Sequence, residues 1–240
     1  MKRTLDHSGF TLIELLVVIA IIAILASLVL TAVVRAKTIA YRTRARAETA
    51  AIATALSGFD SKYGRLPVLP GLGAVSNDVT FGWTEAGPAP TTVIPTNAGI
   101  IAILLDDATY GNGKPTPNEN HVLNPQRMIL LNANRTSDVG APGVGPDGEY
   151  RDPWGQSYVI SLDYSLNNGC RDALYSLAAV SQKTRPMGFN GLLNPAGDGR
   201  SDDYEHVGQF LVWSKGQDRM VSKKQRANAG ENKNNLLHWQ

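Results

Sequence analysis

The longest apolar stretch of the chain covers residues 15–34, in which Ser27 and Thr31 are the only polar side chains. A helix over this stretch is roughly 30 Å long, which matches the hydrocarbon core of a bilayer. A secretory signal peptide is one alternative, but its apolar region is shorter, and residues 30–35 offer no small-residue cleavage site. A buried core helix is another. A terminal helix that is apolar on all sides favours a membrane span over both.

A second periodicity follows the apolar stretch and predicts that the helix continues. Mainly apolar side chains recur at steps of four and three, which places them on one helix face: Tyr41, Ala45, Thr49, Ile52, Leu56, Phe59 and Tyr63. Residues 10–63 contain no proline, and Gly64 and Pro67 then supply a stop signal. We expect one helix about 80 Å long, with a membrane-spanning half (10–34) and an amphipathic half (35–63).

The remainder of the chain, residues 64–240, is polar and rich in glycine, proline and asparagine. Residues 97–105 predict a short helix capped by Thr96 or Asn97. Alternation and β-branched or aromatic content give the strand candidates, which are residues 158–164, 173–180 (the weakest) and 210–213. This mixture predicts an α+β domain.

Glycine and proline make residues 138–148 a loop, whereas residues 125–131 are compatible with helix or strand. The strands are few and short. We therefore expect a small antiparallel sheet with long loops, packed against the amphipathic half of the helix and covering Ile52, Leu56 and Phe59.

Charge and cysteine content add little. The net charge of +2 gives no strong field for nucleic acid, and the single cysteine, Cys170, excludes an internal disulfide. Five basic residues follow the apolar stretch and only two precede it, so a simple positive-inside count would place the long domain in the cytoplasm. The basic flank of residues 35–46 is explained by lipid headgroups, neighbouring subunits or solvent more simply than by nucleic acid.

No catalytic constellation is visible. The chain lacks H-E-x-x-H, G-x-S-x-G and Walker patterns, and its four histidines are isolated: His7, His121, His206 and His238. Asp152, which precedes Pro153 and Trp154, is expected to cap a turn. We expect a protein that is not an enzyme.

The stretch that begins K-R-x₅-G-F-T-L-I-E, from Lys2 to Ala26, resembles the class III signal of type IV prepilins and type II secretion pseudopilins. The resemblance implies that residues 1–9 are a leader peptide. A prepilin peptidase would cut between Gly9 and Phe10 on the cytoplasmic face and methylate the new amine of Phe10. The leader would stay inside and the domain would face the periplasm, against the simple charge count.

Glu14 lies at the leading edge of the apolar stretch, where an unpaired carboxylate is costly, up to about 2.5–3.5 kcal/mol at mid-bilayer. The resemblance implies an assembly role, in which Glu14 meets the cationic amine of Phe10 on the next subunit of a filament. The alternative is that Glu14 favours the helix dipole and reaches the headgroups. Many members of the group carry a proline at the position of Thr31, so this helix lacks a covalent reason to break there.

A narrower resemblance covers parts of the domain. The segments "FDSKYGRLP" from Phe59, "RDPWGQSYVISLDY" from Arg151 and "FLVWSKGQD" from Phe210 are similar to segments of the major pseudopilin of type II secretion. Residues 68–120 have no counterpart that we can place. The segments imply a pilin-like fold with a loop domain stabilised by calcium.

The implied calcium ligands are present only in part. Ser214 and Asp218 match the family segment, but Arg219 stands where a glycine is expected. Asparagines replace the expected acidic residues near the end of the chain: Asn232, Asn234 and Asn235. Calcium takes six to eight oxygen ligands, several of them carboxylates, so its affinity would fall here. A second acidic group, for which a solvated loop is the alternative, comprises Asp198, Asp202, Asp203 and Glu205.

The resemblance thus implies a structural subunit of a type II secretion pseudopilus, polymerised from the inner membrane to drive protein export. Its partners would be copies of itself and other pseudopilins, the prepilin peptidase, an inner-membrane platform with its ATPase, and membrane lipids. A type IV pilin for adhesion, motility or uptake is an alternative. A membrane-anchored periplasmic binding module that never polymerises is another.

Overall fold

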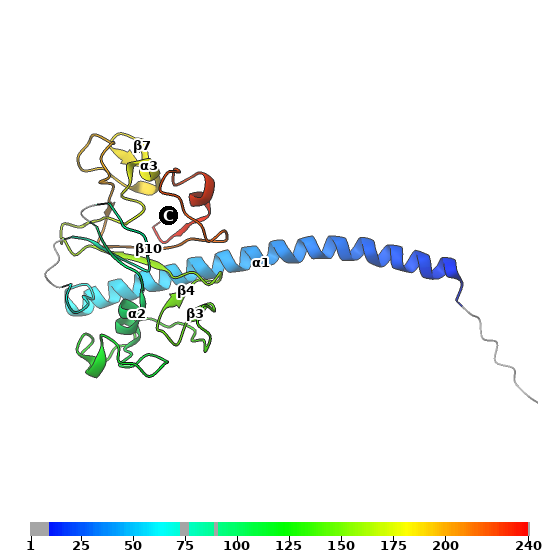
Figure 1. Ribbon diagram of the computed structural model, residues 1–240, viewed down its shortest axis with the longest axis horizontal. Helices are drawn as coiled ribbons and strands as arrows, with labels where there is room; N and C mark the ends of the chain where they lie inside the picture. The colour runs from blue at the N-terminus through cyan, green and yellow to red at the C-terminus, as the bar shows by residue number, and fades with distance from the viewer. Residues whose placement is uncertain (1–9, 73–76, 89–90, 240) are drawn as a thin grey trace, which may run out of the picture. The chain divides into compact units, whose positions relative to one another are not determined.

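The computed structural model describes residues 10–72, 77–88 and 91–239, so the expected leader lies outside the described residues. The predicted α+β class is confirmed, because one long helix, α1 (Leu12–Tyr63), is followed by short strands and long loops (Figure 1). The chain divides into two units, Met1–Ala40 and Tyr41–Gln240. The expected boundary at residue 34, between spanning and amphipathic halves, stays a prediction.

In the first unit, α1 is long and apolar enough to cross a membrane. All side chains from residue 10 to residue 37 are exposed. The two hydroxyls in this stretch are satisfied by the helix itself: Ser27 Oγ donates to the carbonyl of Ile24 (2.7 Å) and Thr31 Oγ1 to that of Leu28 (2.9 Å). The helix continues without a break through Thr31. From residue 15 to residue 34 the helix therefore exposes almost pure hydrocarbon.

In the second unit, one face of α1 is buried as its periodicity predicts. Its buried residues are Ala45, Thr49, Ile52, Ala55, Leu56 and Phe59. Ile52, Leu56 and Phe59 share a core with the sheet residues Ile160 and Val212. The helix ends at Tyr63, and Gly64, in the left-handed region (φ 64°), donates its N–H to Asp60 O at 2.7 Å.

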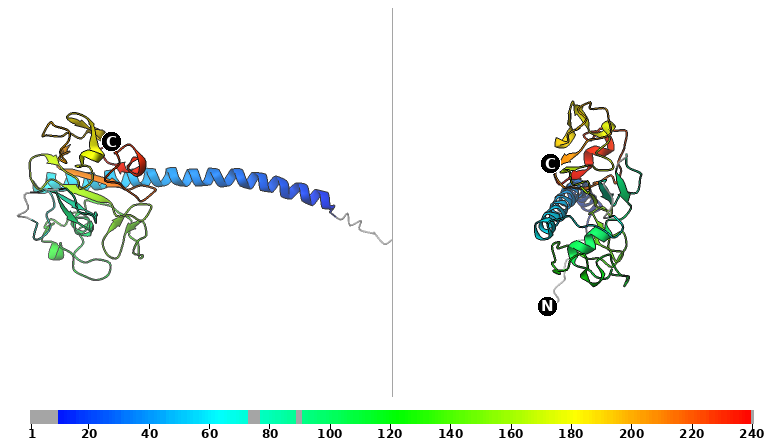
Figure 2. Two further views of the ribbon diagram at one scale, coloured as in Figure 1. Left: turned by 45° about the horizontal axis from the view of Figure 1, so that its top comes forward. Right: turned by 90° about the vertical axis from the view of Figure 1, so that its left-hand side faces the viewer.

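The main sheet has five short strands in the order β11-β10-β5-β1-β2, which lie across the end of α1 (Figure 2). Their bounds are β1 Val79–Phe81, β2 Thr92–Ile94, β5 Val159–Leu162, β10 Phe210–Ser214 and β11 Leu236–Leu237. All neighbouring pairs are antiparallel except β1–β2, which is parallel. The expected small sheet is thus mixed, with one parallel pair at an edge.

Three two-stranded pairs and several short helices accompany this sheet. The two-stranded pairs are β3 (Gly143–Val144) with β4 (Tyr150–Arg151), β6 (Gly169–Cys170) with β9 (His206–Val207), and β7 (Gln182–Thr184) with β8 (Met187–Gly188). The helical elements are α2 (Ala98–Leu105), α3 (Ala178–Ser181), and the 3-10 helices Glu119–His121, Phe189–Gly191 and Gly230–Asn234. The expected loop at residues 138–148 therefore contains one two-residue strand.

The helix expected at residues 97–105 is confirmed as α2, but its cap differs. Thr96 Oγ1 accepts from Ala98 N at 3.1 Å, whereas the Asn97 side chain makes no cap bond. Asn97 is instead fully buried, and its amide donates to the carbonyls of Tyr150 (3.0 Å) and Tyr158 (2.9 Å). Asn97 therefore ties α2 to the main chain of β4 and of the residue before β5.

Residues 173–180 were the weakest strand candidate, and that expectation is wrong. Asp172 Oδ1 accepts the backbone N–H groups of Leu174 (2.8 Å) and Tyr175 (3.0 Å), which turns the chain before α3. Its Oδ2 accepts from Ser161 Oγ (2.7 Å) and Trp213 Nε1 (2.9 Å). A buried carboxylate thus replaces strand pairing and joins the turn to β5 and β10. Residues 125–131 are neither helix nor strand.

His238 closes the edge of the sheet beside β10. Val212 N donates to His238 Nδ1 at 3.0 Å, and His238 N donates to Val212 O at 3.0 Å. Burial lowers the pKa of His238 to about 4, and the neighbouring His206 adds to this effect. The imidazole is therefore held as a neutral acceptor.

Replacing Asp172 by alanine should lower the free energy of unfolding by roughly 3 kcal/mol or more, because four donors lose their acceptor in a dry interior. Denaturant unfolding of the detergent-solubilised chain measures this. Asp138→Ala, at an exposed loop position, is the matched control and should leave the stability within about 0.5 kcal/mol of wild type. Equal stabilities of the two variants would contradict the role of Asp172.

The pKa of His238 predicts how stability varies with acidity. Below pH 6.5, its ordinary pKa, the unfolded chain binds a proton that the folded chain resists until about pH 4. The contribution of His238 to the free energy of unfolding is therefore fully present above pH 6.5. It is lost as the pH falls toward 4, by at most about 1.4 kcal/mol per pH unit. His238→Phe should flatten that part of the curve. Wild-type and variant curves that run parallel between these pH values would contradict the prediction.

Candidate functional site

The candidate site is the start of α1, where Phe10, Thr11 and Glu14 lie; Gly9 is outside the described residues. Phe10 is 82% exposed. Thr11 N donates to Glu14 Oε2 at 2.9 Å, and Thr11 Oγ1 donates to the same oxygen at 2.7 Å. The Glu14 backbone N–H donates to Thr11 Oγ1 at 3.3 Å. This reciprocal pairing is a capping box, which satisfies donors left open at a helix start.

The capping box fixes the direction of the Glu14 carboxylate. Oε2 is occupied by the two Thr11 donors, whereas Oε1 has no hydrogen-bond donor among the described residues. Glu14 is exposed, so Oε1 is open to a donor from outside the chain. The sequence signal for the capping box is T-x-x-E before an apolar run, and residues 11–14 carry it. It was not among the predictions made above from the sequence.

Part of the basic flank has a structural role inside the second unit. Arg44 Nε donates to Glu48 Oε1 at 2.9 Å, and Tyr158 Oη donates to Glu48 Oε2 at 2.5 Å. Burial, reinforced by the charge of Glu48, raises the pKa of Tyr158 far above its ordinary value. Glu48 therefore links α1 to Tyr158 beside β5, and Arg44 pairs with Glu48 on the same helix.

The expected calcium ligands are Ser214, the last residue of β10, and Asp218, which lies in the loop that follows it. Ser214 is buried, donates to Asp152 Oδ2 at 2.6 Å and accepts from Gly216 N at 3.0 Å. Asp218 Oδ2 accepts from Asn234 Nδ2 at 2.8 Å. Arg219 has φ 60°, a left-handed backbone that a glycine adopts more readily.

This donor set does not fit calcium. In this loop, only Asp218 among the expected positions offers a carboxylate, and the described residues contain no group of three or more His, Cys, Asp or Glu that could hold a metal. The side-chain oxygens of the loop that are buried without a partner are Asp218 Oδ1 and Asn235 Oδ1. They supply one carboxylate oxygen and one amide oxygen, whereas calcium prefers several carboxylates among its six to eight oxygen ligands.

The carboxylates of the second acidic group bond to other groups of the domain. Asp198 Oδ1 accepts from Arg200 N and Ser201 N, and Asp202 Oδ1 accepts from Ala178 N. Arg171 pairs with the remaining two members, with Nε 2.6 Å from Asp203 and Nη2 3.0 Å from Glu205. These carboxylates shape the loop around β9.

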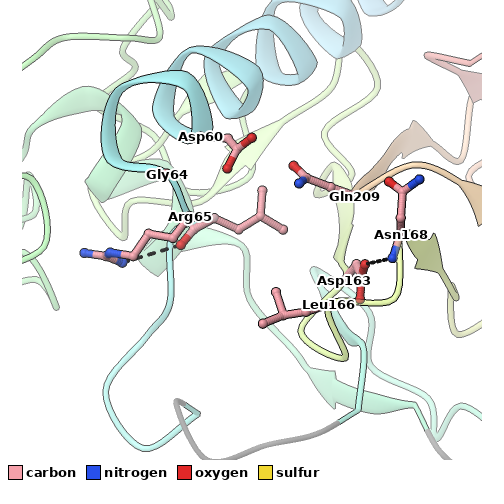
Figure 3. A pocket seen from close by; sticks show the side chains of 8 residues that line it. Asp60, Gly64, Arg65, Asp163, Leu166, Asn168 and Gln209 are labelled. Carbon is pink, nitrogen blue, oxygen red and sulfur yellow. Dashed lines mark hydrogen bonds between the residues drawn. The ribbon is translucent and has the colours of Figure 1, made fainter.

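A cavity of about 220 Å³ lies at the C-terminal end of α1, and Figure 3 shows the side chains that line it. Its lining residues are Asp60, Gly64, Arg65, Leu66, Asp163, Leu166, Asn168 and Gln209. Asp163 uses both carboxylate oxygens to form the turn after β5, accepting from Ser165 Oγ and Asn168 N at 2.8 Å each. The lining therefore offers no pairing of a nucleophile with a base.

Comparison with protein families places the helix start in a known context. Residues 5–30 match the model described as the prokaryotic N-terminal methylation motif. No curated protein and no solved structure gives a significant match. The matched region contains Phe10, Thr11 and Glu14 and indicates a type IV pilin-like precursor of the kind that prepilin peptidase processes. Together with the apolar first unit of α1, it is consistent with membrane anchoring.

Loss of the Thr11 hydroxyl should loosen the first turn of α1. In Thr11→Ala the Glu14 amide loses its acceptor and the carboxylate loses one donor, at a cost of about 1 kcal/mol. Hydrogen–deuterium exchange of the full chain in micelles should show faster exchange at residues 11–15. Thr11→Ser keeps the hydroxyl and should match wild type; faster exchange in both variants would contradict the capping role.

Proposed function

We propose that this chain is a structural subunit of a type II secretion pseudopilus, cut between Gly9 and Phe10 and polymerised from the inner membrane. The observation that carries the proposal is the methylation motif at residues 5–30, with Glu14 in the first turn of α1. The subunit performs no chemistry itself. Growth of the filament pushes exported proteins outward, with energy from a cytoplasmic ATPase that acts through a membrane platform.

The geometry of Glu14 supports an assembly role. In a helical filament each subunit is offset along the axis, so the amine of Phe10 on one subunit can approach the open Oε1 of Glu14 on another. An ion pair in a low-dielectric surrounding is far stronger than in water, and it removes the cost of an unpaired carboxylate in lipid. Transfer from membrane to filament is then favoured only when the pair forms.

The domain supports the pseudopilus over a type IV pilin, which is the second candidate. Two segments that resemble the major pseudopilin meet in space, because Ser214 of β10 bonds Asp152 of the D-P-W-G turn at 2.6 Å. Trp154 of that turn packs edge-on against Tyr41 of α1, with ring centroids 6.0 Å apart. The resembling segments thus form one joint that seats α1 on the domain. The proposed domain location is the periplasm, with residues 1–9 in the cytoplasm.

Glu14→Ala should abolish filaments while leaving cleavage normal, because the Phe10 amine loses its acceptor but the Gly9–Phe10 bond is unchanged. Sheared filaments and membrane-bound subunits are quantified separately, and a loss of at least about tenfold corresponds to 1.4 kcal/mol of pairing energy. Glu119→Ala, at an exposed position of the domain, is the matched control. Normal filaments from Glu14→Ala would support the non-polymerising anchored module instead.

Deletion of the gene separates the two filament functions. A pseudopilus subunit predicts that exported proteins accumulate in the periplasm while adhesion, motility and uptake are unchanged. The opposite pattern would overturn the secretion assignment in favour of a pilus. Complementation with Glu14→Ala should fail in either case.

A further inference from the structure

The long loop between β10 and β11 has little regular structure of its own, apart from the 3-10 helix Gly230–Asn234. It nevertheless packs closely, since Ala227, Asn232 and Asn235 are buried. A loop of this length needs internal partners for its backbone groups to stay folded. Asn232 supplies such partners, and Asn234 and Asn235 bond to side chains at the two ends of the loop.

Asn232 is the centre of the loop and only 1% exposed. Its Nδ2 donates to the carbonyls of Ser222 (2.8 Å) and Gln225 (2.7 Å), and its Oδ1 accepts from Ser222 N at 2.9 Å. All three bonds go to the main chain of the opposite side of the loop. The amide therefore cross-links two segments that have no strand pairing between them.

Asn234 joins the two ends of the loop. Its Nδ2 donates to Asp218 Oδ2 at 2.8 Å, which is a bond to a carboxylate and hence stronger than a neutral one. Gly216 lets the backbones approach: its φ is 74°, and a Cβ there would lie 2.1 Å from Asn234 O. Oδ2 of the Asp218 carboxylate is thus faced by an amide donor, whereas its Oδ1 is buried without a partner among the described residues.

Asn235 fastens the loop to the rest of the domain. Its Nδ2 donates to Tyr175 Oη at 2.8 Å, and the next residue, Leu236, pairs with Ser214 across β10 and β11. Tyr175 itself packs edge-on against Trp213, with ring centroids 5.3 Å apart. The end of the loop is therefore bonded to an aromatic residue of the core, Tyr175.

We propose that Asn232, Asn234 and Asn235 form an amide clasp that closes the β10–β11 loop without calcium, in place of the calcium site that the family resemblance implies. An amide offers a donor as well as an acceptor. Asn232 can therefore bond both N–H and carbonyl groups of the main chain, and Asn234 can donate directly to a carboxylate. The clasp concerns the fold of the loop and stands whether or not the chain assembles into a pseudopilus.

Thermal unfolding of the full chain in detergent tests the clasp. The melting temperature should be the same in millimolar calcium and in EGTA. Asn232→Ala should lower it by roughly 4–8 °C in both conditions, because three buried bonds are lost. Asn228→Ala, at an exposed position of the same loop, should change nothing. A calcium-dependent rise in the wild type, or an Asn232→Ala variant as stable as Asn228→Ala, would overturn the proposal.

Asn234→Asp gives a second test that does not depend on how well Asn232→Ala folds. It places a carboxylate against Asp218, so the two negative charges repel unless a cation lies between them. The variant should melt below wild type in EGTA and recover on addition of calcium. A variant as stable as wild type in EGTA would show that the amide does not face Asp218, and the clasp would be wrong.

Discussion

Apolar side chains on every side of a helix are stable only when something other than water covers them. From residue 12 to residue 34, α1 exposes hydrocarbon all round, and its two hydroxyls are bonded back to the helix. Lipid or another apolar surface must therefore cover this stretch. Under the proposed function, Glu14 near the start of this stretch pairs with the Phe10 amine of another subunit when the helix leaves lipid for the filament.

The second unit answers a different requirement, which is to hold a polar, loop-rich chain on the end of a helix. It does so with buried aspartates that accept backbone N–H groups at turns. Asp152 accepts from Trp154 and Gln156, and Asp172 accepts from Leu174 and Tyr175. Each also reaches a side chain of the sheet, Ser214 or Trp213. These bonds tie loops to strands with few residues in regular structure.

Much of this architecture follows from periodicity. The apolar run and the steps of four and three predict α1, and short apolar alternation predicts β5 and β10. The turn at Asp172 could not be predicted, because its donors include Ser161 and Trp213, which are remote in sequence. The parallel strand β2 has only three residues, too few to show a period. At the helix start, the family resemblance pointed to Glu14. The capping pattern T-x-x-E at residues 11–14 also predicts its pairing with Thr11.

The central claim is that Phe10 becomes a methylated amine that Glu14 of another subunit can meet. Intact mass of the protein extracted from native membranes tests it most directly. The account predicts a chain that begins at Phe10 and is heavier by one methyl group. A chain that keeps residues 1–9 in cells that contain the peptidase would contradict it, because Glu14 would then have no amine to pair with.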